Sequence, residues 1–152
     1  MKLSKIHLAI LIILAILTIL IFAISDNNSI NNKEISQVCF KQNCFSLELA
    51  KTQAEKERGL MYRESLDSNK GMLFIYNTPS KPGFWMKNTL IPLDIIWLDQ
   101  EGKIVHIVTA QPCTQDPCQI YSPDSEASYV LEINAGLSET LGIKEGDVAE
   151  FK

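Results

Sequence analysis

Asp94 is the residue whose setting most clearly suggests chemistry. It lies in an apolar run of strand length, LDIIWLD (93–99), where both alternating faces are apolar. Because an unpartnered polar group is costly to bury, we expect its carboxylate to meet a hydrogen-bond donor. Lys87 and Asn88 are near in sequence and carry such donors. The functional interpretation is a ligand-binding pocket lined by Trp85, Lys87, Asn88 and Asp94.

Two other interpretations of Asp94 stay open. In the structural one, the carboxylate makes an internal hydrogen bond that fixes the turn at Thr89–Pro92, as buried polar groups commonly do. In the catalytic one, a small hydrolase or lyase uses Asp94 with His106 or Lys87 as acid and base. No serine or cysteine lies in a nucleophile-elbow sequence, so acyl transfer is not predicted and no residue is assigned as catalytic.

The remaining titratable residues are interpreted as ordinary. Glu132 alternates with apolar neighbours, a pattern typical of an outward-facing strand residue. His106 shares a strand face with aliphatic residues and is interpreted as a core or rim residue. The other histidine, His7, lies in a long apolar segment, which excludes a multi-histidine metal site. Arg58 and Arg63 could bind an anionic ligand, but they are interpreted as ordinary solvated or ion-paired residues.

The cysteines form two pairs with equal spacing, Cys39 with Cys44 and Cys113 with Cys118. Two local disulfides are the simplest pairing in an oxidising compartment, although four cysteines allow three connectivities. A zinc site with four thiolate ligands and a redox-active pair are the alternatives, and neither pair has CxxC spacing. We therefore predict disulfides, with no metal and no cofactor.

Hydrophobic patterning predicts about eight short strands and two short helices. A capping box, Thr52–Glu55, begins the first helix and Gly59 ends it. The second helix covers Ala135–Leu141. The predicted strands are Gln37–Phe40, Cys44–Leu49, Gly71–Tyr76, Phe84–Thr89, Leu93–Asp99, Lys103–Ala110, Ser128–Asn134 and Val148–Phe151, with loops at Asn77–Gly83 and Gln111–Glu126. We expect a β-rich α+β domain, with an antiparallel-rich sheet that curls or closes into a small barrel.

An apolar segment precedes this domain. Of the 19 residues in 6–24, 17 are apolar, and a helix of that length nearly spans the hydrocarbon core of a bilayer. The lysines of residues 1–5 place the N-terminus in the cytoplasm. We predict a single-pass transmembrane anchor at 6–24, a flexible linker at 25–36 and one extracytoplasmic domain at 37–152. Cleavage after Ser25, which would give a secreted protein, is the alternative.

Charge narrows the choice of partner. The 152 residues carry a net charge of −4, and residues 26–152 alone hold 12 basic and 18 acidic groups. Nucleic-acid binding needs clustered lysine and arginine, so nucleic acid is not predicted as a partner. The predicted partners are the membrane, through residues 6–24, and an unidentified small molecule or envelope protein.

Six segments give the chain its family resemblance. They are GLMYR (59–63), GMLFIY (71–76), FWMKNTLIPLDIIWLD (84–99), PCTQDPC (112–118), YVLEINAG (129–136) and LGIKEGD (141–147). In this order they resemble the prokaryotic family called domain of unknown function 192, over about residues 45–152. The resemblance implies a compact β-rich α+β fold, often secreted or anchored at the N-terminus, and implies no established activity. The Cys113/Cys118 pair falls on the family pattern and the Cys39/Cys44 pair does not.

Three functional hypotheses follow. The first is a membrane-anchored, non-catalytic module that binds a small molecule or a partner. The second is a structural or assembly factor of the envelope, which predicts a co-purifying protein and no pocket. The third is the small hydrolase or lyase built on Asp94.

Overall fold

Strands dominate residues 35–152, the part of the chain that the computed structural model describes together with Leu14 and Ile16. The main sheet has seven strands: β1 (Gln37–Phe40), β2 (Asn43–Ala50), β3 (Lys70–Ser80), β5 (Leu93–Leu98), β6 (Ile104–Ala110), β8 (Ala127–Asn134) and β9 (Glu150–Phe151). A separate ribbon pairs β4 (Phe84–Trp85) with β7 (Ile120–Tyr121). The helices of this region are α2 (Gln53–Arg58) and α3 (Leu137–Thr140).

The strand order of the main sheet is β6-β5-β8-β3-β2-β1-β9. All neighbouring pairs are antiparallel except β2 and β3, which run parallel. A parallel pair cannot be joined by a tight turn, so the chain crosses over between them through α2 and residues 59–69. Strand β8, which comes late in the sequence, therefore lies in the middle of the sheet, between β3 and β5.

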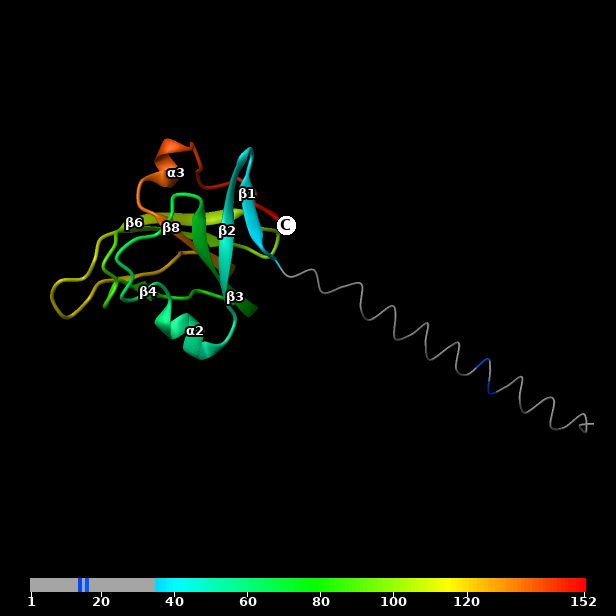
Figure 1. Cartoon of the computed structure of the whole chain (residues 1–152), viewed down its shortest axis with the longest axis horizontal. Coiled ribbons are helices and arrows are strands. Elements are labelled where there is room, and N and C mark those ends of the chain that lie inside the picture. The colour runs from blue at the N-terminus through cyan, green and yellow to red at the C-terminus, as the bar shows by residue number, and fades with distance from the viewer. Residues whose placement is uncertain (1–13, 15, 17–34) are drawn as a thin grey trace, which may run out of the picture. The chain divides into compact units, whose positions relative to one another are not determined.

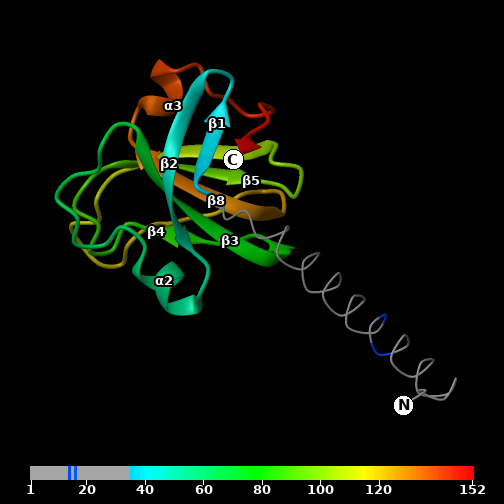
Figure 2. The same cartoon turned by 45° about the vertical axis from the view of Figure 1, so that its right-hand side comes forward.

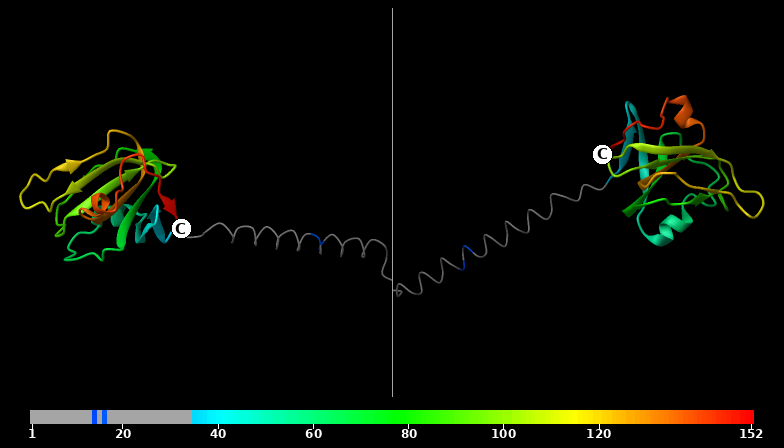
Figure 3. Two further views of the ribbon diagram at one scale, coloured as in Figure 1. Left: turned by 90° about the horizontal axis from the view of Figure 1, so that it is seen from above. Right: turned by 180° about the vertical axis from the view of Figure 1, so that it is seen from behind.

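The sheet curls into a half-barrel. Around the start of β6, the amide of Ala149 donates to the carbonyl of Gly102 and the amide of Ile104 donates to the carbonyl of Asp147. These bonds bring the segment that leads into β9 against the other end of the sheet. Residues from both ends, such as Val38 and Leu98, consequently share one apolar cluster inside the curl. Figure 3 shows the C-terminus beside β1.

Each face of the sheet carries its own core. In β5, Leu93, Ile95 and Trp97 point to the outer face, while Ile96 and Leu98 point to the inner face within the curl. The chain that covers the outer face is the crossover and the β4–β7 ribbon, and α3 packs on the inner side. Figures 1 and 2 show α2 and α3 on opposite sides of the sheet.

Most predicted elements are present, with revised ends. Thr52 caps α2 through the predicted capping box, and Gly59 ends that helix. The hairpin around Lys41 and Gln42 places Cys39 opposite Cys44, as expected. Strand β3 is longer than predicted, because a register shift lets it run on to Ser80 and pair with Ala127. The predicted strand Phe84–Thr89 is reduced to two residues, and the predicted loop 111–126 contains β7.

The membrane prediction concerns a different part of the chain. Among the residues that the structure describes, no helix is long and apolar enough to cross a membrane. Apart from Leu14, Ile16, Ile35 and Ser36, the n-region, the anchor at 6–24 and the linker at 25–36 lie outside those residues. The anchor therefore stays a prediction.

Candidate ligand site

A cavity of about 230 Å³ opens on the outer side of the sheet. One wall is the C-terminal end of α2 with the following turn, and the opposite wall is β4. The residues that line it include Lys56, Arg58, Gly59, Tyr76, Trp85 and Glu132. Aromatic, cationic and acidic groups thus converge on one space.

Glu132 is the unusual residue of this cavity. Its side chain is 5% exposed, and within the described part of the chain it makes no hydrogen bond and no ion pair. Burial raises the pKa of Glu132 to about 8, and the positive charge of Arg63 opposes this shift. At neutral pH the carboxyl is therefore mostly protonated, and its hydrogen-bonding capacity is unused by the protein.

The position of β8 explains why Glu132 is buried. Its register partners are Met72 on β3 and Ile95 on β5, both in the outer core. The turn after α2 then covers this face, since Gly59 and Leu60 line the same cavity. The expectation of an outward-facing Glu132 is therefore wrong. Alternation correctly placed Glu132 and Leu131 on opposite faces of the strand. The face to which Glu132 points is not exposed to solvent, because the turn after α2, far away in sequence, covers it.

Gly59 leaves the space in front of Glu132 open. A Cβ added there would lie 3.8 Å from Glu132 Oε2 and 3.3 Å from the ring of Phe74. The residue also has a φ of +46°, a left-handed conformation that favours glycine. The residue that ends α2 is thus also the one that makes room beside the carboxyl.

Two cationic side chains of the crossover have partners at the edge of this region. Lys56 Nζ lies 4.3 Å from the centre of the Tyr76 ring, a cation–π contact. Burial, with a contribution from Glu132, raises the pKa of Tyr76 to about 12, so its hydroxyl stays neutral. Arg63 forms a two-pronged ion pair with Glu48, at 2.5 and 2.6 Å, which lowers the pKa of Glu48. Arg58 has no ion-pair partner among the described residues.

The structure separates the four residues predicted to form a pocket. Trp85 lines the cavity and is 48% exposed. Lys87 lies 5.6 Å from the Trp85 ring and 3.2 Å from Asp116 Oδ2, so it faces the neighbouring loop. Asn88 has a φ of +58°, and its carbonyl accepts from the amide of Tyr62, which ties the two loops together. Asp94 lies elsewhere.

Asp94 is completely buried on the inner face, under the start of α3. Its carboxylate accepts hydrogen bonds from the Thr109 hydroxyl at 2.6 Å, the Gly136 amide at 3.0 Å, and the amide and hydroxyl of Ser138 at 2.9 and 2.6 Å. These four donors satisfy the hydrogen-bonding capacity of the carboxylate, which gives Asp94 a structural role. The bonds fix the turn into α3 rather than the turn at Thr89–Pro92.

The catalytic pairing of Asp94 with His106 has no geometric support. Asp94 pairs with Thr109 and Trp97 pairs with His106 across β5 and β6, so the two groups lie on opposite faces of the sheet. The His106 ring lies 5.4 Å from the Trp97 ring, and its Nδ1 is 3.1 Å from Glu145 Oε1. Acid–base catalysis needs both groups within reach of one substrate atom, which opposite faces do not allow.

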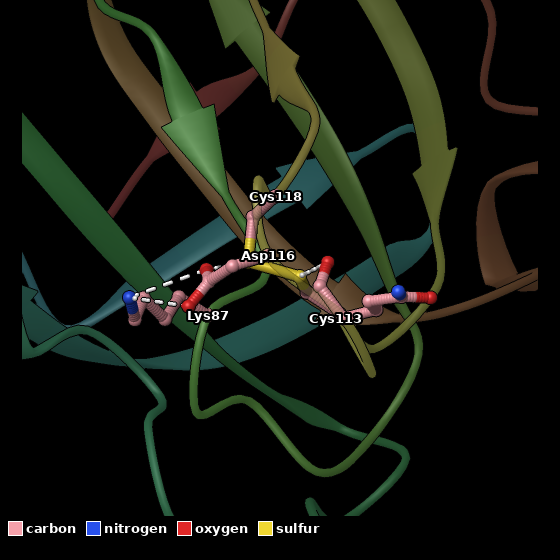
Figure 4. The surroundings of a disulfide bond; sticks show 5 residues. Lys87, Cys113, Asp116 and Cys118 are labelled. Carbon is pink, nitrogen blue, oxygen red and sulfur yellow. Dashed lines mark hydrogen bonds and ion pairs between the residues drawn. A yellow bond between two sulfur atoms is a disulfide. The ribbon is translucent and has the colours of Figure 1, made fainter.

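Both cysteine pairs are joined as disulfides, Cys39 with Cys44 and Cys113 with Cys118. The second closes the loop between β6 and β7, and the Lys87–Asp116 ion pair lies beside it, as Figure 4 shows. Sγ of Cys113, Sγ of Cys118 and a carboxylate oxygen of Asp116 lie within 4.8 Å of one another. Sulfurs held in disulfides are not thiolate ligands, so this arrangement offers zinc no four-thiolate site.

Comparison with known proteins decides the family. The DUF192 family model, described as "Uncharacterized ACR", matches residues 36–151. This chain belongs to the DUF192 family. The resemblance inferred from the six sequence segments is thereby confirmed.

Two curated relatives of this DUF192 protein are named only as UPF0127 proteins. A UPF0127 protein of Thermococcus gammatolerans is 33% identical, over 69% of this chain and 65% of its own length. The UPF0127 protein TK1120 of Thermococcus kodakarensis is 31% identical, over 69% of this chain and 64% of its own. The matched region thus spans just under two thirds of these curated relatives. A crystal structure of a protein of unknown function from Novosphingobium aromaticivorans superimposes with a TM-score of 0.71 at 37% identity, covering 80% of this chain and 88% of that one.

Four of the six segments that carry the DUF192 resemblance meet at the cavity. Segment 59–63 supplies Gly59, segment 71–76 supplies Tyr76, segment 84–99 supplies Trp85, and segment 129–136 supplies Glu132. Sequence reasoning selected Trp85 and weighed Arg58 as a residue that could bind an anion, but it interpreted Glu132 as outward-facing and did not consider Lys56. A signal was available, because Glu132 lies between two apolar residues in the family segment YVLEINAG, but the strand alternation also fitted a solvated side chain.

Proposed function

We propose that this DUF192 domain is a non-catalytic binding module whose small-molecule ligand occupies the cavity beside Glu132. One observation carries the proposal: a carboxyl group that is 5% exposed lines an open cavity without a partner among the described residues. Burying a polar group without a hydrogen bond costs free energy. A ligand that supplies the missing bond recovers that free energy on binding, whereas folding alone does not.

The size of the cavity supports a small ligand. A water molecule occupies about 30 Å³ in the liquid, so a cavity of about 230 Å³ has room for a molecule of roughly eight water-sized groups. This volume is below the range of about 300–1,000 Å³ that is usual for drug-sized ligands. A metabolite of low molecular mass therefore fits better than a cofactor or a peptide.

The binding proposal is tested with the full chain, purified in detergent, in a thermal-unfolding screen against amino acids, sugars, polyols and organic acids. A compound at about 100 times its dissociation constant stabilises the folded state by about 3 kcal/mol, which raises Tm by several degrees. We expect such a shift for the native chain and none for Glu132→Gln. The control variant, Lys87→Gln, alters an exposed ion pair outside the cavity lining and keeps the full shift.

Two results would contradict this function. Equal stabilisation of the native chain and Glu132→Gln by the same compound would place the ligand outside this cavity. A protein that co-purifies in fixed stoichiometry, combined with no shift from any compound, would favour the envelope assembly role.

The proposal includes a location outside the cytoplasm, held by the predicted anchor at 6–24. The apolar segment and its preceding lysines support the anchor, and two disulfides suit an oxidising compartment. Protease added to intact spheroplasts should remove the domain and leave a membrane-bound N-terminal fragment. Protection of the whole chain until the membrane is broken would contradict this location.

A further inference from the structure

The cavity beside Glu132 has an uneven distribution of charge. The acidic group lies at its buried end, and Arg63 is the one cation in the described region whose charge acts on it appreciably. Arg63 itself forms an ion pair with Glu48. A ligand group that reaches Glu132 therefore meets a carboxyl without a cationic partner of its own.

The mouth of the cavity carries the opposite charge. Lys56 and Arg58 line it from the last turn of α2, where Arg58 is exposed and has no ion-pair partner among the described residues. Glu57, between them, also lines the cavity, and its carboxylate accepts a hydrogen bond from Gln53 at 2.8 Å. These three consecutive residues thus leave one positive charge in excess at the entrance.

The walls between these two ends are aromatic. Tyr76, Phe84 and Trp85 all line the cavity. Aromatic rings attract ammonium groups as well as apolar groups, and the ring of Tyr76 already has the Lys56 ammonium 4.3 Å from its centre. The walls therefore suit a ligand that has both a cationic and an apolar part.

From this arrangement we infer that the ligand is a small zwitterion, a free amino acid or close analogue, whose ammonium group contacts Glu132 and whose carboxylate faces Lys56 and Arg58. This inference rests on the proposed binding function. A neutral sugar would use the hydrogen-bonding capacity of Glu132 but not the charge at the mouth. A simple amine would meet repulsion from the two cations, and a simple anion would accept a hydrogen bond from protonated Glu132 but supply no donor to its other oxygen.

Proton release distinguishes these ligand classes. Glu132 is mostly protonated at pH 7, and an incoming ammonium stabilises its ionised form, so the carboxyl gives its proton to solvent while the ligand amine stays protonated. The groups facing this site that also titrate do not interfere near pH 7, because the pKa of Tyr76 is raised and that of Glu48 is lowered. Lys56, Glu57 and Arg58 also line the site, and the hydrogen bonds to Glu48 raise the pKa of Arg63.

The test is isothermal titration calorimetry of the full chain in detergent with each of the twenty amino acids. Titration at pH 7 in two buffers with different ionisation enthalpies measures the protons released. We expect about 0.9 proton released per ligand bound, and an affinity that rises about tenfold per pH unit between pH 6 and pH 7.5. Glu132→Gln should lose the proton release and at least about thirtyfold in affinity, as expected when an ion pair out of water is removed.

Modified ligands test each end of the zwitterion separately. The N-acetyl derivative of the best amino acid should bind at least about a hundredfold more weakly, because it has no ammonium group. The carboxamide derivative should bind about fivefold more weakly, since the contact between the ligand carboxylate and the cations at the mouth is solvated. Arg58→Gln should weaken the binding of the free amino acid about fivefold and leave the affinity for the carboxamide unchanged. Lys87→Gln should change neither affinity.

Each outcome separates this inference from the binding function on which it rests. Sugars or polyols that bind in a Glu132-dependent way without proton release would overturn the zwitterion and keep the binding function. An N-acetyl derivative that binds as tightly as its parent would overturn the ammonium contact. If no amino acid, sugar, polyol or organic acid binds, both the inference and the proposed function fall.

Discussion

Asp94 and Glu132 lie on the adjacent strands β5 and β8, where Asp94 pairs with Ile133 and Glu132 pairs with Ile95. Both are buried carboxyl groups in apolar strands, but they point to opposite faces of the sheet. Asp94 accepts four hydrogen bonds beneath α3, whereas Glu132 has no hydrogen-bonding partner in the described region and faces a cavity. The first arrangement stabilises the fold and the second leaves binding capacity for a ligand. Burial of an acid alone therefore does not indicate a functional site, and the proposed function rests instead on burial without hydrogen-bond donors.

The largest effect should come from removing the satisfied carboxylate. Asp94→Ala leaves the Thr109 and Ser138 hydroxyls and two backbone amides without their acceptor, so we expect a loss of about 4 kcal/mol in the free energy of unfolding. Glu132→Gln removes no hydrogen bond and should be neutral or stabilising. Urea denaturation at pH 7 measures both. Equal destabilisation by the two substitutions would remove the distinction between these carboxyls.

The pH dependence of stability should report Glu132 specifically. Its pKa is about 8 when folded and 4.5 when exposed, so the folded state holds the proton more tightly. Its contribution is complete below pH 4.5 and is lost as pH rises through 8, which predicts a fall of about 3 kcal/mol between pH 5 and pH 8. Urea denaturation across this range should show the fall in the native chain and not in Glu132→Gln. The difference between the two curves cancels the groups they share, and a flat difference would contradict the burial described here.

A smaller effect should follow from filling the space beside Glu132. Gly59→Ala adds backbone strain and a contact of 3.3 Å with Phe74, so we expect a loss of about 2 kcal/mol together with loss of ligand binding. Gly142→Ala is the matched control, because its φ is +65° but nothing lies within 4 Å of the added Cβ. It should lose about 1 kcal/mol and keep binding. Thermal unfolding and the ligand screen compare the two variants, and intact binding in Gly59→Ala would argue against the cavity.

The smallest effect concerns the ion pair predicted to belong to the site. Lys87 and Asp116 are both well exposed, so Lys87→Gln should change the free energy of unfolding by less than about 0.5 kcal/mol. It should also leave ligand affinity unchanged, in contrast to Glu132→Gln. A tenfold loss of ligand affinity in Lys87→Gln, measured by calorimetry, would instead support the pocket predicted from the sequence, which includes Lys87.

Local signals in the sequence predicted local structure well. The reciprocal hydrogen bonds of Thr52 and Glu55 and the stop at Gly59 depend only on neighbouring residues, and these are present. The same is true of the hairpin that pairs Cys39 with Cys44. Alternation also separated Glu132 from Leu131, which lies in the inner core. Caps, turns and alternation are properties of short segments, which is why sequence reasoning reached them.

Caps, turns and alternation do not predict the order of the strands in the sheet. The candidate site depends on that order. Glu132 is buried because β8 inserts between β3 and β5 and because the crossover after β2 covers that face. Asp94 was correctly expected to meet donors, but two of its partners, Gly136 and Ser138, are more than 40 residues away, rather than nearby Lys87 or Asn88. Pairing between distant segments is set by the packing of the whole domain, and the alternation within one strand does not encode it.

The contact between β1 and β9 has a consequence for the order in which the domain folds. The amide of Ser36 donates to the carbonyl of Lys152 at 2.7 Å, across 116 residues of chain. During synthesis, β1 leaves the ribosome before β9. The outer edge of β1 therefore stays unpaired until the residues of β9 have also emerged. Contacts between such distant segments slow folding, because a long loop must close before they form. Completion of the half-barrel is thus expected to be a late step in folding, and the edge of β1 that pairs with β9 is the surface most in need of protection until then.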